Sequence, residues 1–405
     1  MAHVIVVGGG VIGLAAACTL RMRGADVTVV ERGRIGGGAS RGNAGQICPD
    51  LAVPLPSPKV LRDTLTGLVR GRSPLRIRAV DGDVLRFLLG FAAASRHYER
   101  GLAAISSLAA LSIPALREMQ AHGLDTPISE AEYLETFGSV ADAEAVRNAL
   151  VARWPQGRAL PGPVLDHDEV ARIEPMLSDA VRAGFLVPGQ LSIMPGRFVE
   201  ALGAFALRDG VAIREGAHTI SVEADAASVT VNTSNGPIRG THVLVAAGVW
   251  SAELVRPLGV RLPMVAGKGF SFSVTMKDPP QRPTMLQGPH IATLPLGDRT
   301  RISGCMVLDP IPDRFDAERI EEITSAAKPY LRGVDWSSRR DEWVGPRPLT
   351  PTGLPFLGAI DRNARVFVAA GHNMYGVTLA PATARVMADL ICGSAPAVDL
   401  APFAP

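Results

Sequence analysis

The chain has 405 residues, of which 47% are hydrophobic and 20% charged, with a formal net charge of +2. This length exceeds one ordinary hydrophobic core, so we expect two structural domains. The near-neutral charge gives no reason to expect a nucleic-acid partner. The four cysteines and eight histidines show neither paired nor metal-ligand spacing, so neither a disulfide framework nor a metal centre is expected.

The first recognisable pattern begins at the fourth residue. Residues 4–7 are apolar and β-branched, which predicts a buried parallel strand. Gly8, Gly10 and Gly13 follow it in a Gly-x-Gly-x-x-Gly pattern, and residues 14–23 are alanine-rich and free of proline. Such glycines allow a sharp turn, a close approach of the backbone to a pyrophosphate, and tight packing of the helix on the strand.

A second strand is expected over residues 25–30, and it ends at Glu31. An acid at this point of a βαβ unit binds a ribose hydroxyl, which favours FAD or NAD over NADP. The beginning of the helix, at Val11 and Ile12, would face the phosphates with its partial positive charge. The unit therefore predicts a site for an adenine dinucleotide.

The stretch 32–46 contains six glycines and several small polar residues. Its backbone amides can press against a flat or anionic ligand, although a flexible surface loop would have a similar composition. We favour the ligand, because a disordered loop directly after the second strand would add nothing to a compact nucleotide site.

Three short motifs in this region resemble the D-amino-acid dehydrogenase and glycine oxidase (DAO) family: Glu-Arg at 31–32, Gly-Gly-Gly-Ala-Ser at 36–40 and Asn-Ala-Gly-Gln at 43–46. In that family the segment runs under FAD and onto the isoalloxazine. The resemblance implies noncovalent FAD, with Glu31 on the adenosine ribose. It also implies that the cofactor is lined by Arg32, Ser40, Asn43, Ala44, Gly45 and Gln46.

Residues 59–100 carry an excess of arginine with interleaved Leu and Phe. A patch that docks on an anionic membrane would look like this, and so would a solvated helical face with a buried apolar stripe. Membrane contact would suit delivery of electrons to a quinone. Both interpretations remain open at this point.

Segments 228–233 and 238–247 flank Asn235-Gly236, which is a strong hairpin signal. The second of these strands is expected to continue to Gly248. In flavoproteins with two dinucleotide-binding motifs, a similar strand returns the chain to the cofactor where only small residues fit. This resemblance adds Ala247, Gly248 and Trp250 to the cofactor site.

The expected fold is α/β: a Rossmann-type FAD-binding domain with an inserted antiparallel-sheet substrate domain, glutathione-reductase-like and of the DAO type. Residues 260–310 read as antiparallel sheet and are expected to form the floor of the substrate domain. The expected FAD-binding domain is discontinuous and the substrate-binding domain has two segments. Their boundaries are 1–75, 160–255 and 340–405 for the first, and 76–159 and 256–339 for the second.

The C-terminal part carries the most specific match. Residues 343–358 resemble the family's Gly-x-Arg-Pro-x-Thr-x-Asp-x-x-Pro-x-Ile-Gly block, residues 366–372 form the strand after it, and Gly376 opens the last helix. The resemblance implies further cofactor contacts at Gly345, Arg347, Gly371, Gly376, Val377 and Thr378.

Arg347 is the expected clamp for a substrate carboxylate, because its guanidinium can bind two oxygens and stays charged in a closed pocket. Amides at the start of the last helix could stabilise negative charge at flavin N1 and C2=O. His372 and Tyr375 are near enough in sequence to reach the pocket. Met374 stands where glycine oxidases carry a second arginine, which favours a bulkier or more apolar substrate than glycine. No dedicated base is evident.

The expected activity is FAD-dependent dehydrogenation of a D-amino acid or cyclic imino acid by hydride transfer to flavin N5, which gives an imine and then a 2-oxo acid. The alternatives are an oxidase that returns electrons to oxygen and a non-catalytic subunit that relays electrons. A flavoprotein hydroxylase would need a C-terminal Gly-Asp-Ala motif, which is absent from the sequence. The early first strand and the lack of a long apolar run predict a cytoplasmic protein, with association at the inner face of the membrane left open.

Overall fold

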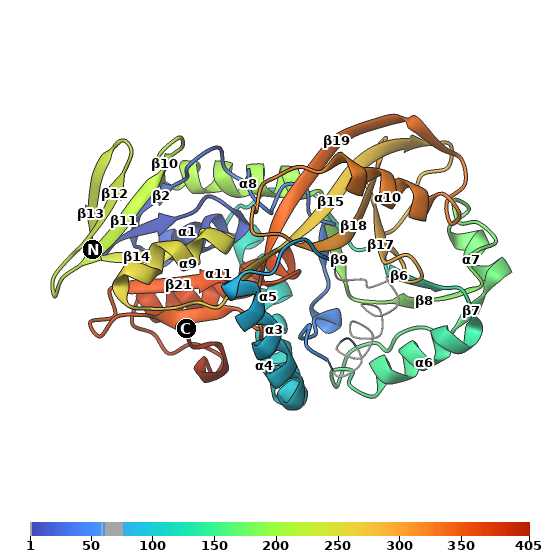
Figure 1. Ribbon diagram of the computed structural model, residues 1–405, viewed down its shortest axis with the longest axis horizontal. Helices are drawn as coiled ribbons and strands as arrows, with labels where there is room; N and C mark the ends of the chain where they lie inside the picture. Colours follow the sequence, from blue (N-terminus) through green and yellow to red (C-terminus); the bar gives the residue numbers. More distant parts are fainter. Residues whose placement is uncertain (1, 58–59, 61–75) are drawn as a thin grey trace.

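The computed structural model describes residues 2–57, 60 and 76–405, and two large sheets lie toward opposite ends of its longest axis (Figure 1). The first has six strands in the order β10-β2-β1-β14-β21-β20. All neighbours are parallel except β20 and β21. The strands are β1 His3–Val7, β2 Asp26–Val30, β10 Ala212–Arg214, β14 His242–Val245, β20 Phe356–Ala359 and β21 Val366–Ala370.

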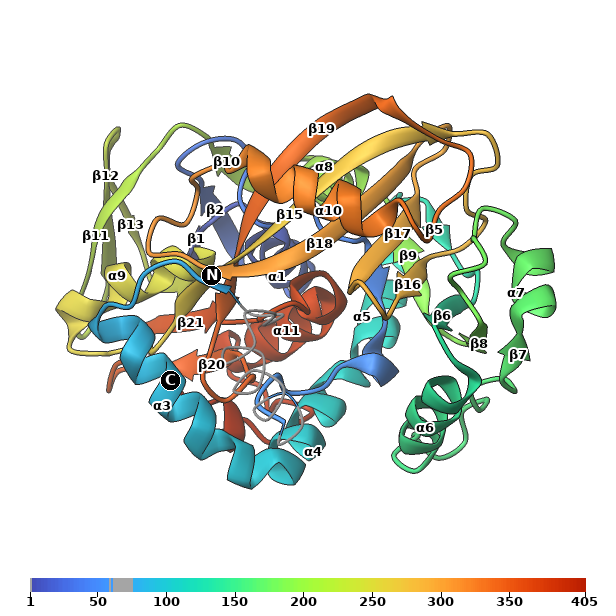
Figure 2. The same ribbon diagram turned by 45° about the vertical axis from the view of Figure 1, so that its right-hand side comes forward.

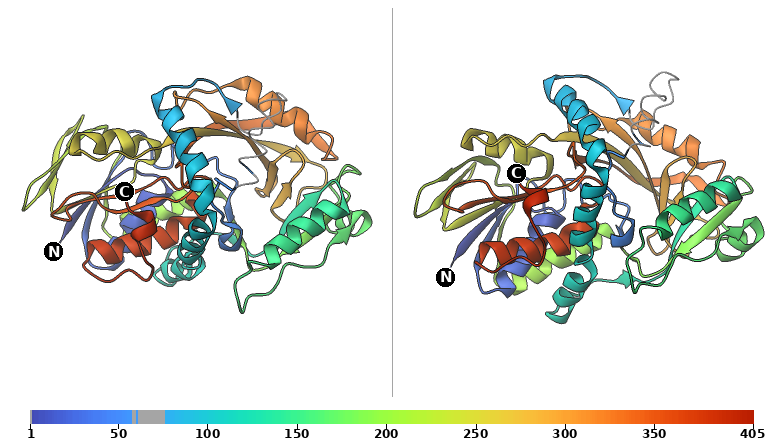
Figure 3. Two further views of the ribbon diagram at one scale, coloured as in Figure 1. Left: turned by 60° about the horizontal axis from the view of Figure 1, so that its bottom comes forward. Right: turned by 90° about the horizontal axis from the view of Figure 1, so that it is seen from below.

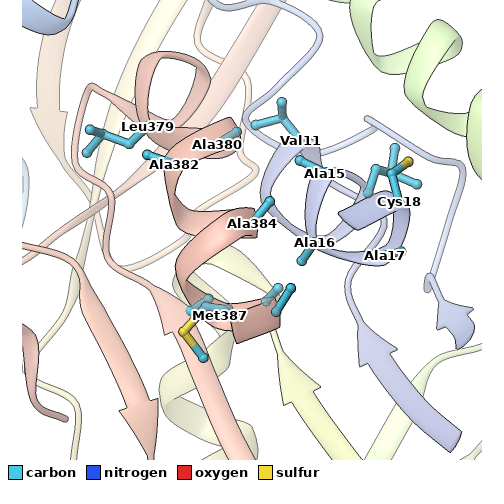
Figure 4. Packing of buried hydrophobic residues seen from close by; sticks show 14 of the residues in the cluster. Val11, Ala15, Ala16, Ala17, Cys18, Leu379, Ala380, Ala382, Ala384 and Met387 are labelled. Carbon is cyan, nitrogen blue, oxygen red and sulfur yellow. The ribbon is translucent and has the colours of Figure 1, made fainter. Parts of the chain in front are cut away.

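One face of this sheet is covered by helices α1 (Val11–Met22), α8 (Pro195–Arg208) and α11 (Gly376–Ile391). Figure 4 shows α1 and α11 meeting through small side chains, with Ala15 and Ala16 facing Ala384. Alanines let two helices approach closely without leaving cavities. The contact holds the first turns of both helices beside the carboxyl ends of the strands. Strands β1 and β2 pair in parallel on either side of α1 in the chain, so the predicted N-terminal βαβ unit is confirmed.

The other face is covered by α9 (Ser251–Val255) and a three-stranded antiparallel sheet of β11 (Thr219–Ala224), β12 (Val229–Thr233) and β13 (Gly236–Gly240). The expected hairpin is confirmed, with its two-residue turn at Ser234-Asn235 and Gly236 as the first residue of β13. The continuous strand expected over 238–247 is wrong, because the chain leaves the hairpin at Thr241 and enters the parallel sheet as β14. Thr241 exchanges hydrogen bonds of 3.0 Å with the backbone of His3, which fixes this crossing.

The second large sheet is mostly antiparallel and runs in the order β19-β15-β18-β17-β16-β6-β8-β7, with β4 paired to β18 (Figure 2). The expected antiparallel sheet over 260–310 is thereby confirmed. Its strands are β4 Arg76–Ile77, β6 Tyr133–Phe137, β7 Leu165–Asp166, β8 Ala183–Val187, β15 Val265–Met276, β16 Thr284–Leu286, β17 Ile291–Pro295, β18 Thr300–Leu308 and β19 Val334–Leu349.

The expected boundaries assign residues 160–255 and 340–405 to the cofactor domain. In the structure β7, β8 and β19, which includes residues 340–349, belong to the second sheet instead. Strand β8 pairs with β6, from a segment about 50 residues earlier in the chain, and β19 pairs with β15. An apolar pattern predicts a strand but does not say which sheet it joins, because pairing is decided by tertiary contacts. The exact domain division stays a proposal.

Helices α6 (Val140–Val151), α7 (His167–Ile173) and α10 (Ala317–Ala327) accompany this sheet. A small third sheet consists of β3 (Gln46–Ile47), β5 (Ile128–Ser129) and β9 (Leu191–Ile193), with β9 in the middle. Because β3 carries Gln46, this sheet braces the end of the glycine-rich loop.

Helices α3 (Gly82–Ala94), α4 (Tyr98–Ala109) and α5 (Ser112–Ala121) follow one another along the molecule (Figure 3). In the part of the chain that the structure describes, the helical segment Gly82–Ala121 is long and apolar enough to cross a membrane, judged by length and composition alone. The sequence-based expectation that the chain has no such segment is therefore corrected. In the structure α4 and α5 pack against α11, and 44% of the most apolar window is buried. Most of the basic stretch at 59–75 lies outside the described residues, so membrane docking remains a prediction.

Candidate active site

A cavity of about 1200 Å³ lies between the carboxyl ends of the parallel strands and the second large sheet. Val7, Val30, Ala246 and Ala370 mark the ends of β1, β2, β14 and β21 along its wall. Ligands of open parallel sheets bind outside these strand ends. The cavity is therefore where the sequence patterns place a dinucleotide.

At the nucleotide end, the Glu31 carboxylate lies over the glycine turn. The Gly9 N–H donates to its Oε2 at 2.7 Å, and the Gly33 N–H donates to its Oε1 at 2.9 Å. The guanidinium of Arg32 stacks on the Trp250 ring, 3.7 Å from its centroid. Two segments that are far apart in sequence thus close this end of the cavity.

The expected cofactor residues separate into two groups in the structure. Gly13, Gly45, Gly345 and Gly371 are not among the residues that line the cavity. Gly13 instead lies so close to the Gly8 carbonyl that a Cβ would overlap it. The expected residues that do line the cavity are Gly8, Gly10, Val11, Ile12, Glu31, Arg32, Ser40, Asn43, Ala44, Gln46, Ala247, Gly248, Trp250, Arg347, Gly376, Val377 and Thr378.

Polar groups line the middle of the cavity. The Gln46 side chain lies within hydrogen-bonding reach of Tyr133, and the Gln46 carbonyl accepts from Thr378 Oγ1 at 2.9 Å. This bond ties the glycine-rich loop to the first turn of α11, whose residues Gly376 and Val377 also face the cavity. A side-chain amide and a helix N-terminus both suit the polar edge of a flavin. The residues present therefore fit FAD.

Arg347 comes from β19 and reaches across β15 to β18. Its Nη1 donates to the Cys305 carbonyl at 2.9 Å. Burial lowers the pKa of the guanidinium to about 10, so Arg347 stays charged at neutral pH. Two carboxylates close to Arg347 in the sequence, Asp341 and Glu342, are candidate partners for it. In the structure Asp341 accepts from Ser273 and Glu342 pairs with Arg339, so among the described residues no carboxylate neutralises Arg347.

A β-bulge creates the space for this arginine. Lys268 pairs with Val307 and Phe270 with Gly304, which leaves Cys305 and Met306 of β18 opposite the single residue Gly269 of β15. Cys305 has a φ of +63°, an unusual value for a residue with a side chain. Bulges re-aim groups near active sites, and this one turns the Cys305 carbonyl toward Arg347.

His372 and Tyr375 line the same cavity just before and at the start of α11. His372 Nε2 lies 3.0 Å from Thr383 Oγ1, and burial lowers the pKa of the imidazole to about 3. His372 is therefore neutral at any working pH. Burial raises the pKa of Tyr375, which keeps its hydroxyl protonated and able to donate.

A second polar group lies in the cavity wall and was not among the residues expected from the sequence. Tyr133 and Glu135 lie on the same face of β6 and Gln287 follows β16, and all three line the cavity. Gln287 Nε2 donates to Glu135 Oε2 at 2.7 Å, and burial raises the pKa of Glu135 to about 7. The one available signal was a charged residue in the middle of a strand, Tyr-Leu-Glu-Thr-Phe at 133–137, which alone does not predict a site.

The cavity runs from a dinucleotide turn to a half-buried cation, an arrangement that suits a flavin-dependent oxidoreductase. In the part of the chain that the structure describes, no group of three or more His, Cys, Asp or Glu could hold a metal ion. The chain belongs to the family of FAD-dependent oxidoreductases (DAO), whose family model matches residues 3–390.

Two similar proteins are named D-amino acid dehydrogenase. The one from Cereibacter sphaeroides (strain ATCC 17029 / ATH 2.4.9) is 30% identical and the match covers 98% of this chain and 94% of that protein. The one from Sinorhizobium medicae (strain WSM419) is also 30% identical, with 96% and 95% covered. Both matches extend over nearly the whole of both proteins, so they include the two large sheets and the cavity between them.

Solved structures share the fold. Glycine oxidase from Geobacillus kaustophilus superposes with a TM-score of 0.76 at 24% identity, over 100% of this chain and 98% of that one. L-proline dehydrogenase from P. horikoshii gives a TM-score of 0.76 at 17% identity, over 100% and 96%. The expected α/β fold with its cofactor and substrate parts is confirmed.

Proposed function

We propose that this protein dehydrogenates a D-amino acid or cyclic imino acid, giving an imine that hydrolyses to a 2-oxo acid. The observation that carries this proposal is the half-buried, charged Arg347, which has no carboxylate partner among the described residues and faces the same cavity as the dinucleotide turn. A substrate carboxylate would complete its ion pair, and the guanidinium fork would fix the orientation of that substrate.

Glu31, Arg32, Ser40 and the start of α1 would hold the dinucleotide part of FAD, while Gln46 and the start of α11 would hold the flavin. FAD supplies a hydride acceptor at N5. Bound cofactor and substrate would displace water around Arg347, which would strengthen its attraction for an anion. Tyr375 is placed to donate to the substrate or to pack beneath the flavin, and no residue is needed as a base if the amine binds neutral.

The named relatives support the choice of substrate. Two proteins called D-amino acid dehydrogenase match over almost the whole of this chain. The exposed Met374, where glycine oxidases carry a second arginine, favours a substrate bulkier than glycine. Arg153, two residues after α6, lines a smaller cavity that adjoins the main one and shares Glu135 and Gln287 with it.

We further propose that electrons pass to a carrier such as a membrane quinone, and that the protein works in the cytoplasm, near the inner face of the membrane. An oxidase would instead form one peroxide per imine, so peroxide measured against 2-oxo acid distinguishes the two. Sedimentation with anionic liposomes at low salt tests the membrane contact, and protein left wholly in the supernatant would remove it.

Anaerobic mixing of the purified yellow protein with D-amino acids, their L-enantiomers and cyclic imino acids tests the proposed activity. Bleaching of the flavin by D-amino or imino acids is the expected result. A protein that keeps its colour with every compound would be a non-catalytic electron relay, and selective bleaching by L-amino acids would reverse the proposed stereochemistry.

A further inference from the structure

Glu135 is a carboxylate built into the cavity wall on the second large sheet, two residues from Tyr133, which lies beside Gln46. It lies in the middle of β6 and only 8% of the residue is exposed. Gln287 donates to its Oε2, whereas no described residue donates to its Oε1. An oxygen that faces a cavity without a protein donor can accept a hydrogen bond from a ligand there.

The register of the second sheet shows which way Glu135 points. Six residues, one from each of six neighbouring strands, are paired strand to strand and form a row across the sheet. Paired residues point to the same side, so their side chains all lie on one face of the sheet. This face also meets the cofactor loop, because Ser271 Oγ donates to the Gly42 carbonyl at 2.9 Å. The row is Glu135, Met285, Ala292, Ser303, Ser271 and Trp343.

Arg347 lies on the same face as Trp343, and its guanidinium reaches the Cys305 carbonyl of β18. Strand β6 is three strands away from β18, with β17 and β16 between them. Cys305 lies two residues along β18 from Ser303, the member of the row on that strand. At roughly 4.8 Å per strand and 3.3 Å per residue, the two charged groups are on the order of 15 Å apart across a flat sheet. The curvature of the sheet brings them closer.

An amino acid with a long side chain matches this separation. An extended lysine measures about 7 Å from its carboxyl carbon to its terminal nitrogen and an arginine about 8 Å, and an ion contact of about 3 Å at each end brings the totals to about 13 and 14 Å. Shorter side chains held at Arg347 would not reach Glu135.

We infer that Glu135 binds the cationic end of the substrate side chain, so that the preferred substrates are D-amino acids with a terminal ammonium or guanidinium group. The inference rests on the proposed function, because it takes Arg347 as the carboxylate site. Met285 and Ala292 provide the apolar wall between the two ends, where the methylenes of such a side chain would lie.

The charges around Glu135 agree with a cationic ligand. Tyr133 on β6 is protonated, since burial raises its pKa well above the usual value, and burial likewise raises the pKa of the Cys48 thiol. Arg153 lines a second cavity together with Glu135, but it donates to the Asp50 carbonyl and forms no ion pair with Glu135. Asp50 also acts on the Cys48 thiol, but it pairs with Arg158 at 3.2 Å. Of these two carboxylates, Glu135 is the one with no cationic partner among the described residues, and Gln287 leaves its second oxygen open.

This arrangement sets a pH dependence. Burial raises the pKa of Glu135 to about 7, so part of the protein carries a neutral Glu135 at neutral pH. A cation binds the ionised form, so its affinity increases as the pH rises through about 7 and levels off above it. A neutral side chain of equal length gains nothing from this ionisation.

The test uses the holoenzyme and two pairs of compounds that differ in one terminal group. D-lysine and D-norleucine report turnover, and 6-aminohexanoate and hexanoate report binding through the flavin absorbance without reaction. Glu135→Gln keeps the shape and the hydrogen bond to Gln287 but removes the charge. Glu144→Gln, which removes an exposed carboxylate on α6, is the matched control.

We expect wild-type protein at pH 8 to prefer D-lysine over D-norleucine, and 6-aminohexanoate over hexanoate, by about tenfold or more, with smaller ratios at pH 6. Glu135→Gln should lose about 30-fold or more in kcat/KM for D-lysine, keep D-norleucine within about threefold, and retain its FAD. Glu144→Gln should behave as wild type.

The inference would be overturned if wild-type protein showed the same kcat/KM for D-lysine and D-norleucine and the same affinity for 6-aminohexanoate and hexanoate. It would also be overturned if Glu135→Gln lowered kcat/KM equally for both amino acids. Either result would leave the proposed activity intact. Selective binding of 6-aminohexanoate without flavin reduction by any D-amino acid would support the cation site and contradict the proposed activity. Failure of both measurements would remove both.

Discussion

The guanidinium of Arg347 occupies the space that a side chain on Gly269 would fill. Gly269 lies directly beneath it on β15, and the bulge at Cys305 and Met306 widens the gap on the far side. The position of the proposed carboxylate clamp thus depends on a residue that never contacts the substrate. Gly269 does not have a positive φ, so an alanine there would cause no backbone strain. Its added methyl group would instead collide with the Arg347 guanidinium.

Gly269→Ala should therefore displace Arg347 and weaken substrate binding. We expect KM to rise about 10- to 100-fold, as a misplaced bidentate contact costs roughly 1.5–3 kcal/mol, with FAD content unchanged. Steady-state kinetics and the flavin spectrum of the same sample measure both. Gly138→Ala is the control, because a Cβ there meets nothing within 4 Å. A Gly269→Ala protein with normal KM would show that Arg347 need not lie where the structure places it.

Glu31→Ala should loosen FAD. The substitution removes the two backbone hydrogen bonds that Gly9 and Gly33 donate, as well as the proposed contact with the ribose. Bonds to a charged group are worth roughly 1.5–3 kcal/mol, so the Kd for FAD should increase about 10- to 100-fold. Titration of apoprotein with FAD, followed by flavin fluorescence, measures it, and an unchanged Kd would place the ribose elsewhere.

The same preparations test whether FAD is noncovalent. Acid precipitation should release all the colour into the supernatant, since noncovalent FAD is freed when the protein unfolds. Colour that stays in the pellet would contradict this.

Glu135 should make stability depend on pH in a defined window. Burial raises its pKa from 4.5 to about 7, so between these values the unfolded chain releases a proton that the folded protein retains. The folded state is favoured most below pH 4.5 and loses roughly 3 kcal/mol as the pH rises through 7. Glu135→Gln removes this titration, so relative to wild type it should gain stability between pH 5 and pH 8.

Urea unfolding of both proteins at the two pH values, without amino acids, measures the difference. Other titrating groups are common to the two proteins and cancel in the comparison. Parallel changes in wild type and Glu135→Gln would show that Glu135 titrates normally.

His372 should contribute no ionisation to the reaction. Burial lowers its pKa to about 3, so the imidazole is neutral above pH 4, where it is held by Thr383. His372→Asn should therefore leave both limbs of the pH profile of kcat/KM unchanged while lowering Tm. Loss of one limb in this variant would make His372 an acid or base in the reaction.

The N-terminal site was predictable because its signals are local. Gly8, Gly10 and Glu31 stand at fixed spacings in one βαβ unit, and each residue type is required by backbone geometry. The structure places all three in the cavity wall. The start of α11 was likewise predictable from a contiguous motif.

The other half of the cavity was not predictable, because it depends on strand pairing. Glu135 faces the cavity only because β6 joins β16, from a segment about 150 residues later, and the row then crosses to β19. The same limit explains the misplaced strands β7 and β8. A bulge such as that at Cys305 leaves no pattern in the sequence that distinguishes it from an ordinary strand residue.

The anaerobic reduction of bound FAD by a D-amino acid, compared in wild type and Arg347→Met by rapid mixing, tests the central claim most directly. Loss of the guanidinium leaves a desolvated carboxylate unpaired at about 2–5 kcal/mol, so the second-order rate constant for reduction should fall roughly 30- to 5,000-fold with FAD content unchanged. Arg347→Lys should recover part of the loss, because an ammonium cannot form two parallel hydrogen bonds. Reduction of Arg347→Met at the wild-type rate, half-saturating at the same amino-acid concentration, would contradict the assignment of Arg347 as the carboxylate site.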